Sequence, residues 1–292
     1  MKILACIPAF NEENIIGDVV KKTLSYVDKV IVCDDGSVDN TFNEAKIAGA
    51  EVIHHSENLG KGAALKSLFN YARNSNFDAI VTIDGDGQFL PEEITSLVKS
   101  IVEKKSDVVI GYRFDDKTEM PLYRKVGNKI LDKMTSLASD LPFRDTQSGF
   151  RAYSKKAIEL ITFQTNGFGA DSEILINISK KSLRISEQKV TVLYDTGRKT
   201  STKNPLSHSG EVITSIIELV AIRHPLKYLG ISGIIFLIIG IIFSVIIIST
   251  FNDTRYFSIP FTLLSMGSLL IGLMFLLISV LLFSINKSLH KS

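Results

Sequence analysis

The N-terminal part of the chain alternates short apolar runs with longer stretches in which apolar residues recur every three or four positions. The short runs predict β-strands, and the longer stretches predict amphipathic helices with one face against a core. We expect strands at residues 3–8, 30–33, 51–54, 79–83 and 108–111, and helices at residues 14–25, 41–48, 60–74 and 91–104. This α/β alternation predicts a Rossmann-like, mostly parallel sheet covered by helices on both faces.

Polar residues follow four of these predicted strands directly. The stretches are residues 8–13 (PAFNEE), 34–37 (DDGS), 84–88 (DGDGQ) and 112–113 (YR). In open parallel sheets, ligands bind in the crevice beyond the carboxyl ends of the strands. The pattern therefore predicts one binding site to which four strand ends contribute.

Charged residues almost disappear after residue 229. Of the 33 Lys and Arg residues and the 31 Asp and Glu residues, only Asp253, Arg255, Lys287 and Lys291 follow Gly230. The uncharged stretches at residues 229–251 and 258–285 are each long enough to cross a hydrocarbon core of ~30 Å as a helix rising ~1.5 Å per residue. We predict two transmembrane helices. A pair of core helices in a soluble protein is the alternative, but such helices usually carry a polar stripe, which these runs lack.

Basic residues flank the outer ends of the two apolar stretches. They are Arg223, Lys227, Lys287 and Lys291, whereas only residues 252–257 connect the stretches. By the positive-inside rule, both chain ends face the cytoplasm. The apolar run at the start of the chain is too short for a signal peptide, so we expect the N-terminal domain to stay in the cytoplasm as well.

A helical stripe of apolar residues lies just before the first apolar stretch, within residues 210–223. We interpret it as an amphipathic helix on the membrane surface, and packing against the N-terminal domain is the alternative. The expected organisation is an α/β domain at residues 1–205, a juxtamembrane interfacial helix at 206–228, two transmembrane helices at 229–285 and a cytoplasmic tail at 286–292.

The stretch after the fourth predicted strand has the donor pattern of a metal site. Asp84, Asp86 and Gln88 place three oxygen donors at alternate positions, which suits a hard divalent cation such as Mg²⁺ or Mn²⁺ shared with substrate phosphates. A calcium-binding EF-hand is excluded because Phe89 stands where that loop needs Gly, and Thr95 where it needs Glu. The remaining alternative is a plain solvated turn.

Two common phosphate-binding patterns are missing from the sequence, namely GxGxxG after the first strand and GxxxxGK[ST]. Acidic strand ends instead indicate a ligand whose negative charge is bridged by metal, and Asp34 or Asp35 could accept hydrogen bonds from a ribose or a base. The arginines after residue 111 would suit a diphosphate and a second anionic substrate through bidentate contacts. We expect this role for Arg113 and interpret Arg144 as a surface residue.

Cysteines and net charge exclude two further classes of site. Cys6 and Cys33 both fall in predicted strands, so we expect buried, reduced thiols and not a disulfide or a metal pair. The net charge is only +2, and the basic residues are not interleaved with aromatic ones. Nucleic-acid binding is therefore not expected.

Six short motifs, taken in order, closely resemble those of family 2 glycosyltransferases of the GT-A fold, in particular the dolichol-phosphate mannose synthase group. They are residues 8–13, 34–37, 58–62 (NLGKG), 84–88, 111–113 (GYR) and 148–151 (SGFR). The resemblance covers roughly residues 3–205. One motif departs from many relatives, which have DADL where this chain has DGDGQ. Metal ligation is expected to survive, because both carboxylates and a third oxygen ligand remain.

The resemblance implies roles for individual residues. It assigns the nucleotide to Pro8, Ala9, Asn11, Glu12, Asp34 and Asp84. It assigns the metal and the diphosphate to Asp84, Asp86 and Gln88. It assigns the acceptor phosphate to Arg113, Arg124, Ser201 and Lys203. The residues expected to take part in catalysis are Asp86, Arg113, Arg124 and Arg198, with Arg198, Ser201 and Lys203 closing over the reaction centre.

The expected function is the inverting transfer of a hexose from a nucleotide-diphosphate sugar, either GDP-mannose or a UDP-sugar, to dolichyl or polyprenyl phosphate. It would take place at the cytoplasmic face of the membrane, among membrane lipids, and supply lipid-linked sugar for glycan or glycoprotein assembly. A phosphate acceptor is already ionised at neutral pH, so no strong general base is needed. Asp171 and Glu173 are available as a base, and a charge at a helix N-terminus is an equally good interpretation of both.

Three other functions are considered. A processive polysaccharide synthase would carry a QxxRW motif, and this chain has no Trp. A glycosyltransferase with a hydroxyl acceptor stays open, and an essential Asp171 or Glu173 would favour it. A non-catalytic nucleotide-sugar-binding scaffold is disfavoured because Asp84, Asp86 and Gln88 are all present.

Overall fold

The computed structural model describes residues 1–113, 132, 135–136, 142–167, 169–193 and 225–289 of the chain. The chain divides into two compact units, Met1–Ile216 and Ile217–Ser292. The predicted interfacial helix at residues 210–223 lies outside the described residues, and so do Arg124, Arg198, Ser201 and Lys203.

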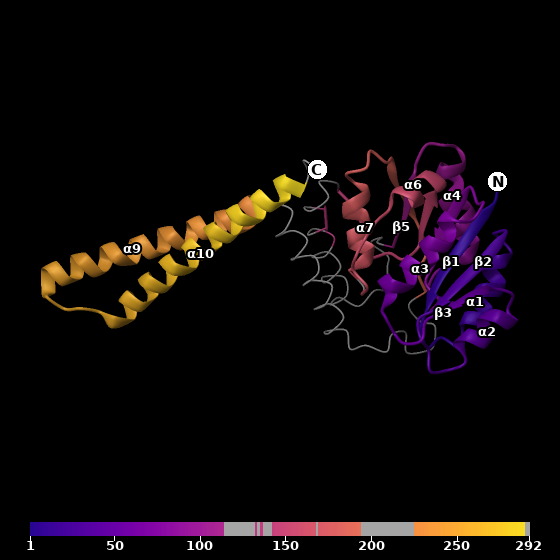
Figure 1. The fold of residues 1–292 in the computed structure, drawn as a ribbon, viewed down its shortest axis with the longest axis horizontal. Coiled ribbons are helices and arrows are strands. Elements are labelled where there is room, and N and C mark those ends of the chain that lie inside the picture. The colour runs from indigo at the N-terminus through magenta and orange to yellow at the C-terminus, as the bar shows by residue number, and fades with distance from the viewer. Residues whose placement is uncertain (114–131, 133–134, 137–141, 168, 194–224, 290–292) are drawn as a thin grey trace. The chain divides into compact units, whose positions relative to one another are not determined.

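In the described part of the first unit, seven strands form one sheet in the order β3-β2-β1-β4-β6-β5-β7. Strands β1, β2, β3 and β5 of this sheet are labelled in Figure 1. The strands are β1 (Ile3–Ala9), β2 (Lys29–Asp34), β3 (Glu51–His54), β4 (Ala79–Thr82), β5 (Val108–Tyr112), β6 (Arg151–Ser154) and β7 (Ile185–Lys189). Only β6 runs antiparallel to its neighbours, β4 and β5. The prediction of a mostly parallel sheet is therefore confirmed.

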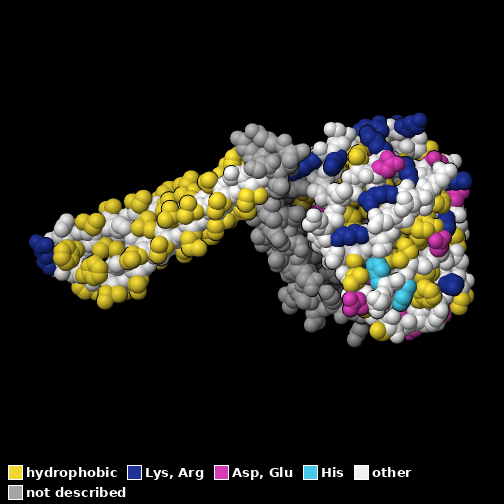
Figure 2. Space-filling view, viewed as in Figure 1, with side chains coloured by type: hydrophobic (Ala, Val, Ile, Leu, Met, Phe, Trp, Pro, Cys, Tyr) yellow, Lys and Arg dark blue, Asp and Glu magenta, His cyan; other side chains and the backbone are white. Residues whose placement is uncertain are grey.

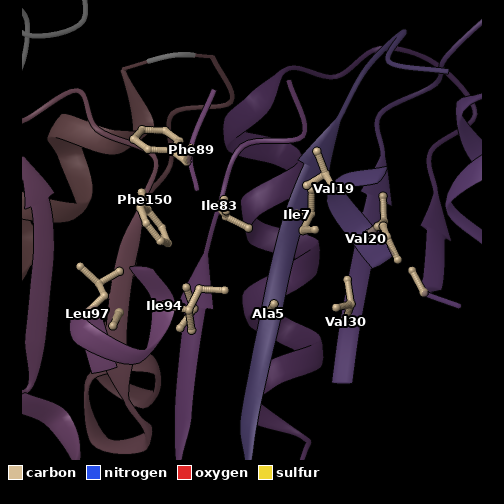
Figure 3. Close-up of a cluster of buried hydrophobic side chains, with 14 of the residues drawn as sticks. Ala5, Ile7, Val19, Val20, Val30, Ile83, Phe89, Ile94, Leu97 and Phe150 are labelled. Atoms are coloured by element: carbon tan, nitrogen blue, oxygen red, sulfur yellow. The ribbon is translucent and has the colours of Figure 1, made fainter. Parts of the chain in front are cut away.

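Two hydrophobic clusters, one on each face of the sheet, hold the helices in place. The helices of this unit are α1 (Ile16–Leu24), α2 (Thr41–Ile47), α3 (Lys61–Arg73), the 3-10 turn η1 (Pro91–Glu93), α4 (Ile94–Val102), α6 (Lys155–Leu160) and α7 (Ala170–Ile178). Residues of α1, α2 and α4 belong to the first cluster, part of which is shown in Figure 3. Residues of α3, α6 and α7 belong to the second. Successive residues of β1 alternate between the clusters, as the pleat of a strand requires.

The second cluster contains both cysteines. Cys6 and Cys33 are free thiols with no exposed surface, as predicted. Burial raises the pKa of Cys33 to about 12, with a smaller contribution from Asp35, and burial also raises the pKa of Cys6. Both side chains therefore act as small apolar core residues.

The sequence predicted the elements up to residue 111 and the two C-terminal apolar helices, and it missed the strands β6 and β7 between them. Every predicted strand and helix up to residue 111 is present, although the last predicted helix begins as the turn η1. Strand β6 was not predicted, because the four residues of Arg151–Ser154 include two polar ones and give no strand pattern. Strand β7 at Ile185–Lys189 was missed for the same reason, since it is a mostly polar edge strand.

The second unit is an antiparallel pair of apolar helices. A π-helical turn at Leu226–Gly230 leads into α9 (Ile231–Thr254), and α10 (Ile259–Leu289) returns alongside it. Gly233 lies so close to α10 that a Cβ atom there would be 2.9 Å from the carbonyl oxygen of Gly272. Between the helices, the Ser265 hydroxyl donates to the carbonyl oxygen of Gly240 at 2.9 Å. Close approach at small residues is typical of helix pairs in membranes.

Both helices are long and apolar enough to cross a bilayer. Leu226–Thr254 has 29 residues and Ile259–Ile285 has 27, and their 18-residue apolar stretches have mean hydropathies of 3.1 and 2.7. Hydrophobic side chains cover their surfaces in Figure 2, and few of them are buried within the unit. The exposed apolar surface is what a lipid environment would cover.

Candidate active site

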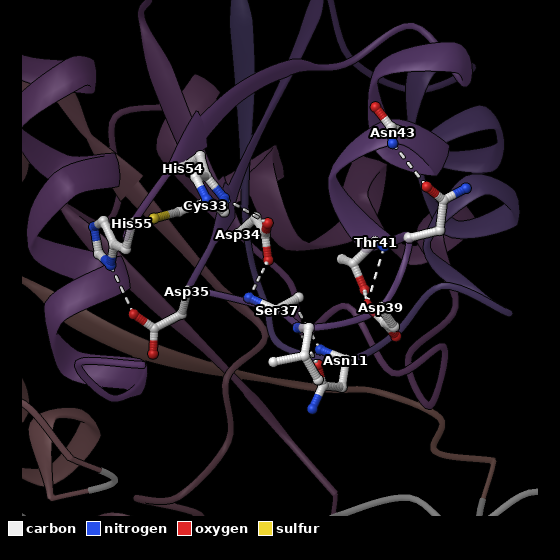
Figure 4. A network of polar contacts seen from close by, with 12 residues as sticks. Asn11, Cys33, Asp34, Asp35, Ser37, Asp39, Thr41, Asn43, His54 and His55 are labelled. Atoms are coloured by element: carbon white, nitrogen blue, oxygen red, sulfur yellow. Dashed lines mark hydrogen bonds and ion pairs between the residues drawn. The ribbon is translucent and has the colours of Figure 1, made fainter. Parts of the chain in front are cut away.

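The loops after β1 and β2 are joined by hydrogen bonds at the carboxyl end of the sheet (Figure 4). These strands are parallel neighbours, with Ala9 opposite Asp34. The backbone N–H of Asn11 donates to the Ser37 hydroxyl at 2.9 Å, and the Asn11 side-chain oxygen accepts from the backbone N–H of Val38 at 3.0 Å. Asn11 has a φ of 56°, a conformation that asparagine tolerates better than most residues. Asn11 and Asp34, two of the predicted nucleotide residues, therefore lie at adjacent strand ends whose loops hold each other in place.

Asp34 is buried at the end of β2, and both its oxygens have partners. One oxygen accepts from the backbone N–H of Ser37 at 3.2 Å, and the other accepts from His54 Nδ1 at 2.8 Å. His54 is the last residue of the neighbouring strand β3, opposite Asp34 in the register. The protein thus orients the Asp34 carboxylate before any ligand binds.

An acidic cluster lies where β4 ends. Burial, followed by the negative charge of Asp84, raises the pKa of Asp86 to about 6. Burial, followed by the charges of Asp86, Asp39 and Asp84, raises the pKa of Glu12 to about 7. Glu12 follows β1, whereas Asp84 and Asp86 follow β4, so the two strand ends converge as predicted. The cluster carries more negative charge than its protein surroundings neutralise, which is the environment that a bound cation stabilises.

Lys61 forms ion pairs within this cluster, and no role for it was predicted from the sequence. Its ammonium lies 2.9 Å from Asp84 Oδ1 and 3.0 Å from Asp171 Oδ2, and its side chain is 15% exposed. Burial lowers the pKa of Lys61, but the charges of Asp171 and Asp84 outweigh burial, and the pKa lies above its ordinary value. The available signal was the Gly-Lys-Gly sequence at the start of a helix. Its partners lie 23 and 110 residues further along the chain, which no local pattern reveals.

Gly149 packs directly against the side chain of Asp84. A Cβ atom at this position would clash with the Asp84 carboxylate, so any other residue would displace that side chain. The adjacent Arg151 has no exposed surface and donates to the carbonyl oxygens of Asp171 at 3.0 Å and Thr146 at 2.7 Å. The motif at residues 148–151 therefore makes room for Asp84 and anchors the segment that carries Asp171.

Arg113 is held by a buried carboxylate that the sequence analysis did not single out. Its Nε and Nη2 atoms donate to the two oxygens of Asp145 at 2.7 and 2.9 Å, and its backbone N–H donates at 3.0 Å. This two-pronged pair fixes the plane of the guanidinium group. Binding of an acceptor phosphate by Arg113 stays a prediction. Arg144, interpreted as a surface residue, is largely exposed and pairs with Glu187.

Asp171 and Glu173, the two possible bases, have different surroundings. The Glu173 carboxylate accepts from the backbone N–H groups of Gln164 at 3.0 Å and Thr165 at 2.8 Å, so it fastens a loop to α7. Asp171 instead pairs with Lys61. Of the two, only Asp171 shares a partner with Asp84.

The residues present fit a divalent cation by their chemistry. Within the described ranges, no three acidic, histidine or cysteine side chains form a metal-binding group by themselves. The predicted set contains two carboxylates and one amide oxygen, from Asp84, Asp86 and Gln88, and its use as a metal site stays a prediction. Oxygen donors of this kind suit Mg²⁺ and Mn²⁺, which commonly take their remaining ligands from water and substrate phosphates.

The fold and the acidic strand ends define the class of GT-A glycosyltransferases. The chain belongs to glycosyl transferase family 2, whose sequence model it matches over residues 5–162. The glycosyltransferase resemblance seen in the six motifs is thereby confirmed.

Relatives and solved structures agree with this assignment. The chain is 34% identical over 220 residues to the uncharacterised protein MJ1222 of Methanocaldococcus jannaschii, covering 73% of this chain and 87% of that protein. It is 33% identical over 215 residues to a UDP-N-acetylglucosamine–dolichyl-phosphate N-acetylglucosaminyltransferase of Methanococcus voltae, covering 66% and 86%. It is 28% identical over 209 residues to an undecaprenyl-phosphate mannosyltransferase of Micrococcus luteus, covering 65% and 83%.

The fold also matches that of glucosyl-3-phosphoglycerate synthase from Mycobacterium tuberculosis, solved with Mn²⁺, UDP and phosphoglyceric acid. The TM-score is 0.58 at 21% identity, over 75% of this chain and 78% of that one. At this identity the match supports the fold alone.

Proposed function

We propose that this protein transfers a hexose from a nucleotide-diphosphate sugar to a polyprenyl or dolichyl phosphate. The observation that carries the proposal is the combination, in one chain, of a family 2 catalytic domain with two helices apolar and long enough to cross a bilayer. An acceptor with a long hydrocarbon tail resides in the membrane, where such helices would hold the enzyme. The names of the relatives from Methanococcus voltae and Micrococcus luteus support the same acceptor class.

The donor is assigned to the carboxyl ends of β1, β2 and β4. Asn11, Glu12 and Asp34 would hold the nucleoside, and their fixed loops mean that little ordering is needed on binding. A Mg²⁺ or Mn²⁺ ion held by Asp84 and Asp86, with Gln88, would supply positive charge for the diphosphate leaving group. The ion pair with Lys61 orients the Asp84 carboxylate.

The reaction is a single in-line displacement. A phosphate oxygen of the acceptor forms a bond to the anomeric carbon while the bond to the nucleotide diphosphate breaks, so the configuration inverts. No proton has to be removed from an ionised phosphate. The surroundings of Glu173 support this step, because its carboxylate is already engaged by backbone N–H groups. Arg113, oriented by Asp145, would bind the acceptor phosphate.

The catalytic domain and both termini are proposed to lie in the cytoplasm. The flanking basic residues at positions 223, 227, 287 and 291 support this orientation. Insertion of a glycosylation tag or a protease site after residue 292 or between residues 252 and 257 tests it. The tail should be accessible only from the cytoplasmic side, and the connection only from the opposite side.

Transfer of labelled sugar into solvent-extractable lipid tests the reaction. The purified chain, in detergent or nanodiscs, is given polyprenyl phosphate, Mn²⁺ and, in turn, GDP-mannose, UDP-glucose and UDP-N-acetylglucosamine. We expect label from one donor to enter the lipid, and EDTA or the substitution Asp86→Ala to abolish it. Absence of lipid label from every donor, in protein that binds nucleotide, would contradict the proposal.

A further inference from the structure

Asp35 and His55 form a buried pair beside the candidate site, just beyond the ends of β2 and β3. Asp35 Oδ1 accepts a hydrogen bond from His55 Nδ1 at 2.6 Å (Figure 4). Asp35 is 3% exposed and the His55 side chain 11%. Asp34 before it contacts Ser37 and His54, so the two consecutive aspartates have separate partners. The Asp35 side chain binds the loop before α3 instead.

The Asp35 carboxylate fixes the backbone of the loop at residues 58–62. Its Oδ2 atom accepts from the backbone N–H of Gly60 at 2.7 Å, and Oδ1 accepts from that of Leu59 at 3.2 Å. Gly60 has a φ of 99°, and a Cβ atom there would lie 2.5 Å from the carbonyl oxygen of Asn166. The loop is thus held by Asp35 on one side and packed against another loop on the other.

His55 extends the same network to helix α3. Because a carboxylate can only accept, His55 Nδ1 is the donor to Asp35. In the neutral ring, Nε2 then accepts from the Ser67 hydroxyl, whose oxygen lies at 2.9 Å. Ser67 lies in the second turn of α3, and the Cys33 sulfur approaches the same nitrogen at 3.5 Å. His55 therefore connects Asp35 to the helix as well as to the sheet.

Both sets of contacts converge on the segment that carries Lys61. Lys61 is the first residue of α3 and directly follows Gly60, whose N–H is bound by Asp35. Its ammonium lies between Asp84 and Asp171, at 2.9 and 3.0 Å. A shift of about 1 Å in the start of α3 would break both ion pairs, because charged hydrogen bonds need donor–acceptor distances near 2.7–2.9 Å.

We propose that Asp35 and His55 are positioning residues for the transfer reaction, which act through the loop at residues 58–62 and α3 to hold Lys61 between Asp84 and Asp171. The proposal rests on the assignment of Asp84 to the donor site. A positioning role of Asp35 and His55 differs from a purely stabilising role in one measurable respect. A positioning pair loses its effect on the reaction once Lys61 is gone, whereas a stabilising pair does not.

A double-mutant cycle of His55→Ala and Lys61→Met measures this dependence. We expect kcat/KM for the nucleotide sugar to fall about tenfold in His55→Ala and about a hundredfold in Lys61→Met. In the double variant the fall should stay within about twofold of that in Lys61→Met, because the two substitutions remove the same contact. A fall in the double variant near a thousandfold, the product of the two effects, would overturn the proposal.

Conservative substitutions give an independent readout. In His55→Asn the side-chain amide can place an N–H near the position of Nδ1, so most of the activity lost in His55→Ala should return. Equal losses in His55→Asn and His55→Ala, with both proteins folded by circular dichroism, would contradict the proposal. The exposed Lys21 provides a matched control, since Lys21→Met removes a lysine charge on α1, which packs on the opposite face of the sheet from α3. If His55→Ala does not fold, Ser67→Ala takes its place in the cycle.

The same cycle can be run without any lipid acceptor. Calorimetric binding of Mn²⁺ with UDP, and of Mn²⁺ with GDP, reports on the donor site alone. We expect His55→Ala to weaken binding of the better nucleotide in the wild-type background and to leave it unchanged in the Lys61→Met background. This binding experiment does not require an acceptor, so it tests the positioning proposal even if the acceptor is not a polyprenyl phosphate. Failure of the positioning proposal and failure of the proposed function therefore give different results.

Discussion

Two groups of carboxylates in the catalytic domain have opposite electrostatic situations. Around the ends of β1 and β4, Glu12 and Asp86 have raised pKa values because burial and neighbouring acids oppose their ionisation. Around β5 and α7, Asp145 is paired with Arg113, and Glu173 is bound by backbone N–H groups. In the first group, the charges of Lys61 and Arg113 do not offset burial and the repulsion between the acids, so an added cation would stabilise the ionised carboxylates. The second is already satisfied by the protein and serves to shape it.

The largest effect on activity is expected when a carboxylate of the first group is replaced by a neutral side chain. Asp86→Asn removes a charge that the proposed cation needs while keeping the size of the side chain. We expect kcat to fall about a thousandfold or more, the scale seen when a key electrostatic contact in an active site is lost. A thermal unfolding curve without divalent cation should show unchanged or increased stability, since a buried, poorly neutralised charge is removed. An Asp86→Asn variant that kept more than a tenth of the wild-type activity would contradict the distinction between the two groups.

A smaller effect on activity is expected when Asp145, a carboxylate of the second group, is substituted. Asp145→Asn keeps the shape but weakens the two-pronged hold on Arg113. We expect the KM for the lipid phosphate to rise about tenfold, with the KM for the nucleotide sugar nearly constant. Steady-state kinetics with each substrate varied in turn provide the measurement. An equal rise in both KM values would show that Asp145 supports the whole fold and not the acceptor side.

The pH dependence of cation binding sharpens the comparison further. A carboxyl group whose pKa is higher in the folded than in the unfolded state reduces stability as pH rises through that range. Without divalent cation, ionisation of Asp86 and Glu12 should therefore destabilise the folded domain between about pH 4 and pH 7. Mn²⁺ binds the ionised form, so its dissociation constant should fall at least about fourfold from pH 5.5 to pH 7.5. Calorimetry checks this, and a constant affinity would contradict the first group's role.

The smallest effect on chemistry is expected at Glu173. Glu173→Gln keeps one oxygen acceptor for the Gln164 and Thr165 N–H groups, and we expect kcat to change less than about threefold. The free energy of unfolding should fall by about 1–2 kcal/mol, because hydrogen bonds to a charged acceptor are replaced by fewer and weaker ones to a neutral amide. Chemical denaturation and initial rates measure the two quantities. A large loss of kcat with full stability would identify Glu173 as a general base and favour a hydroxyl acceptor.

How far the sequence predicts this molecule depends on the range of the contacts involved. The elements before residue 111 follow from local periodicity, and both apolar helices follow from composition. The antiparallel β6 could not be predicted, since its position between β4 and β5 depends on pairing with residues about 40 and 70 positions away. The same holds for the site. Strand ends indicated Glu12, Asp84 and Asp86, whereas the contact of Lys61 with Asp171 and that of Arg113 with Asp145 exist only in the folded chain.

The acceptor gives the most direct test of the central claim. Purified protein in nanodiscs is offered the preferred nucleotide sugar with either polyprenyl phosphate or the corresponding polyprenol, which differ only in the phosphate. We predict transfer to polyprenyl phosphate, with inverted configuration at the anomeric carbon, and none to polyprenol. Equal transfer to the alcohol would contradict the account and identify the protein as a glycosyltransferase for hydroxyl acceptors.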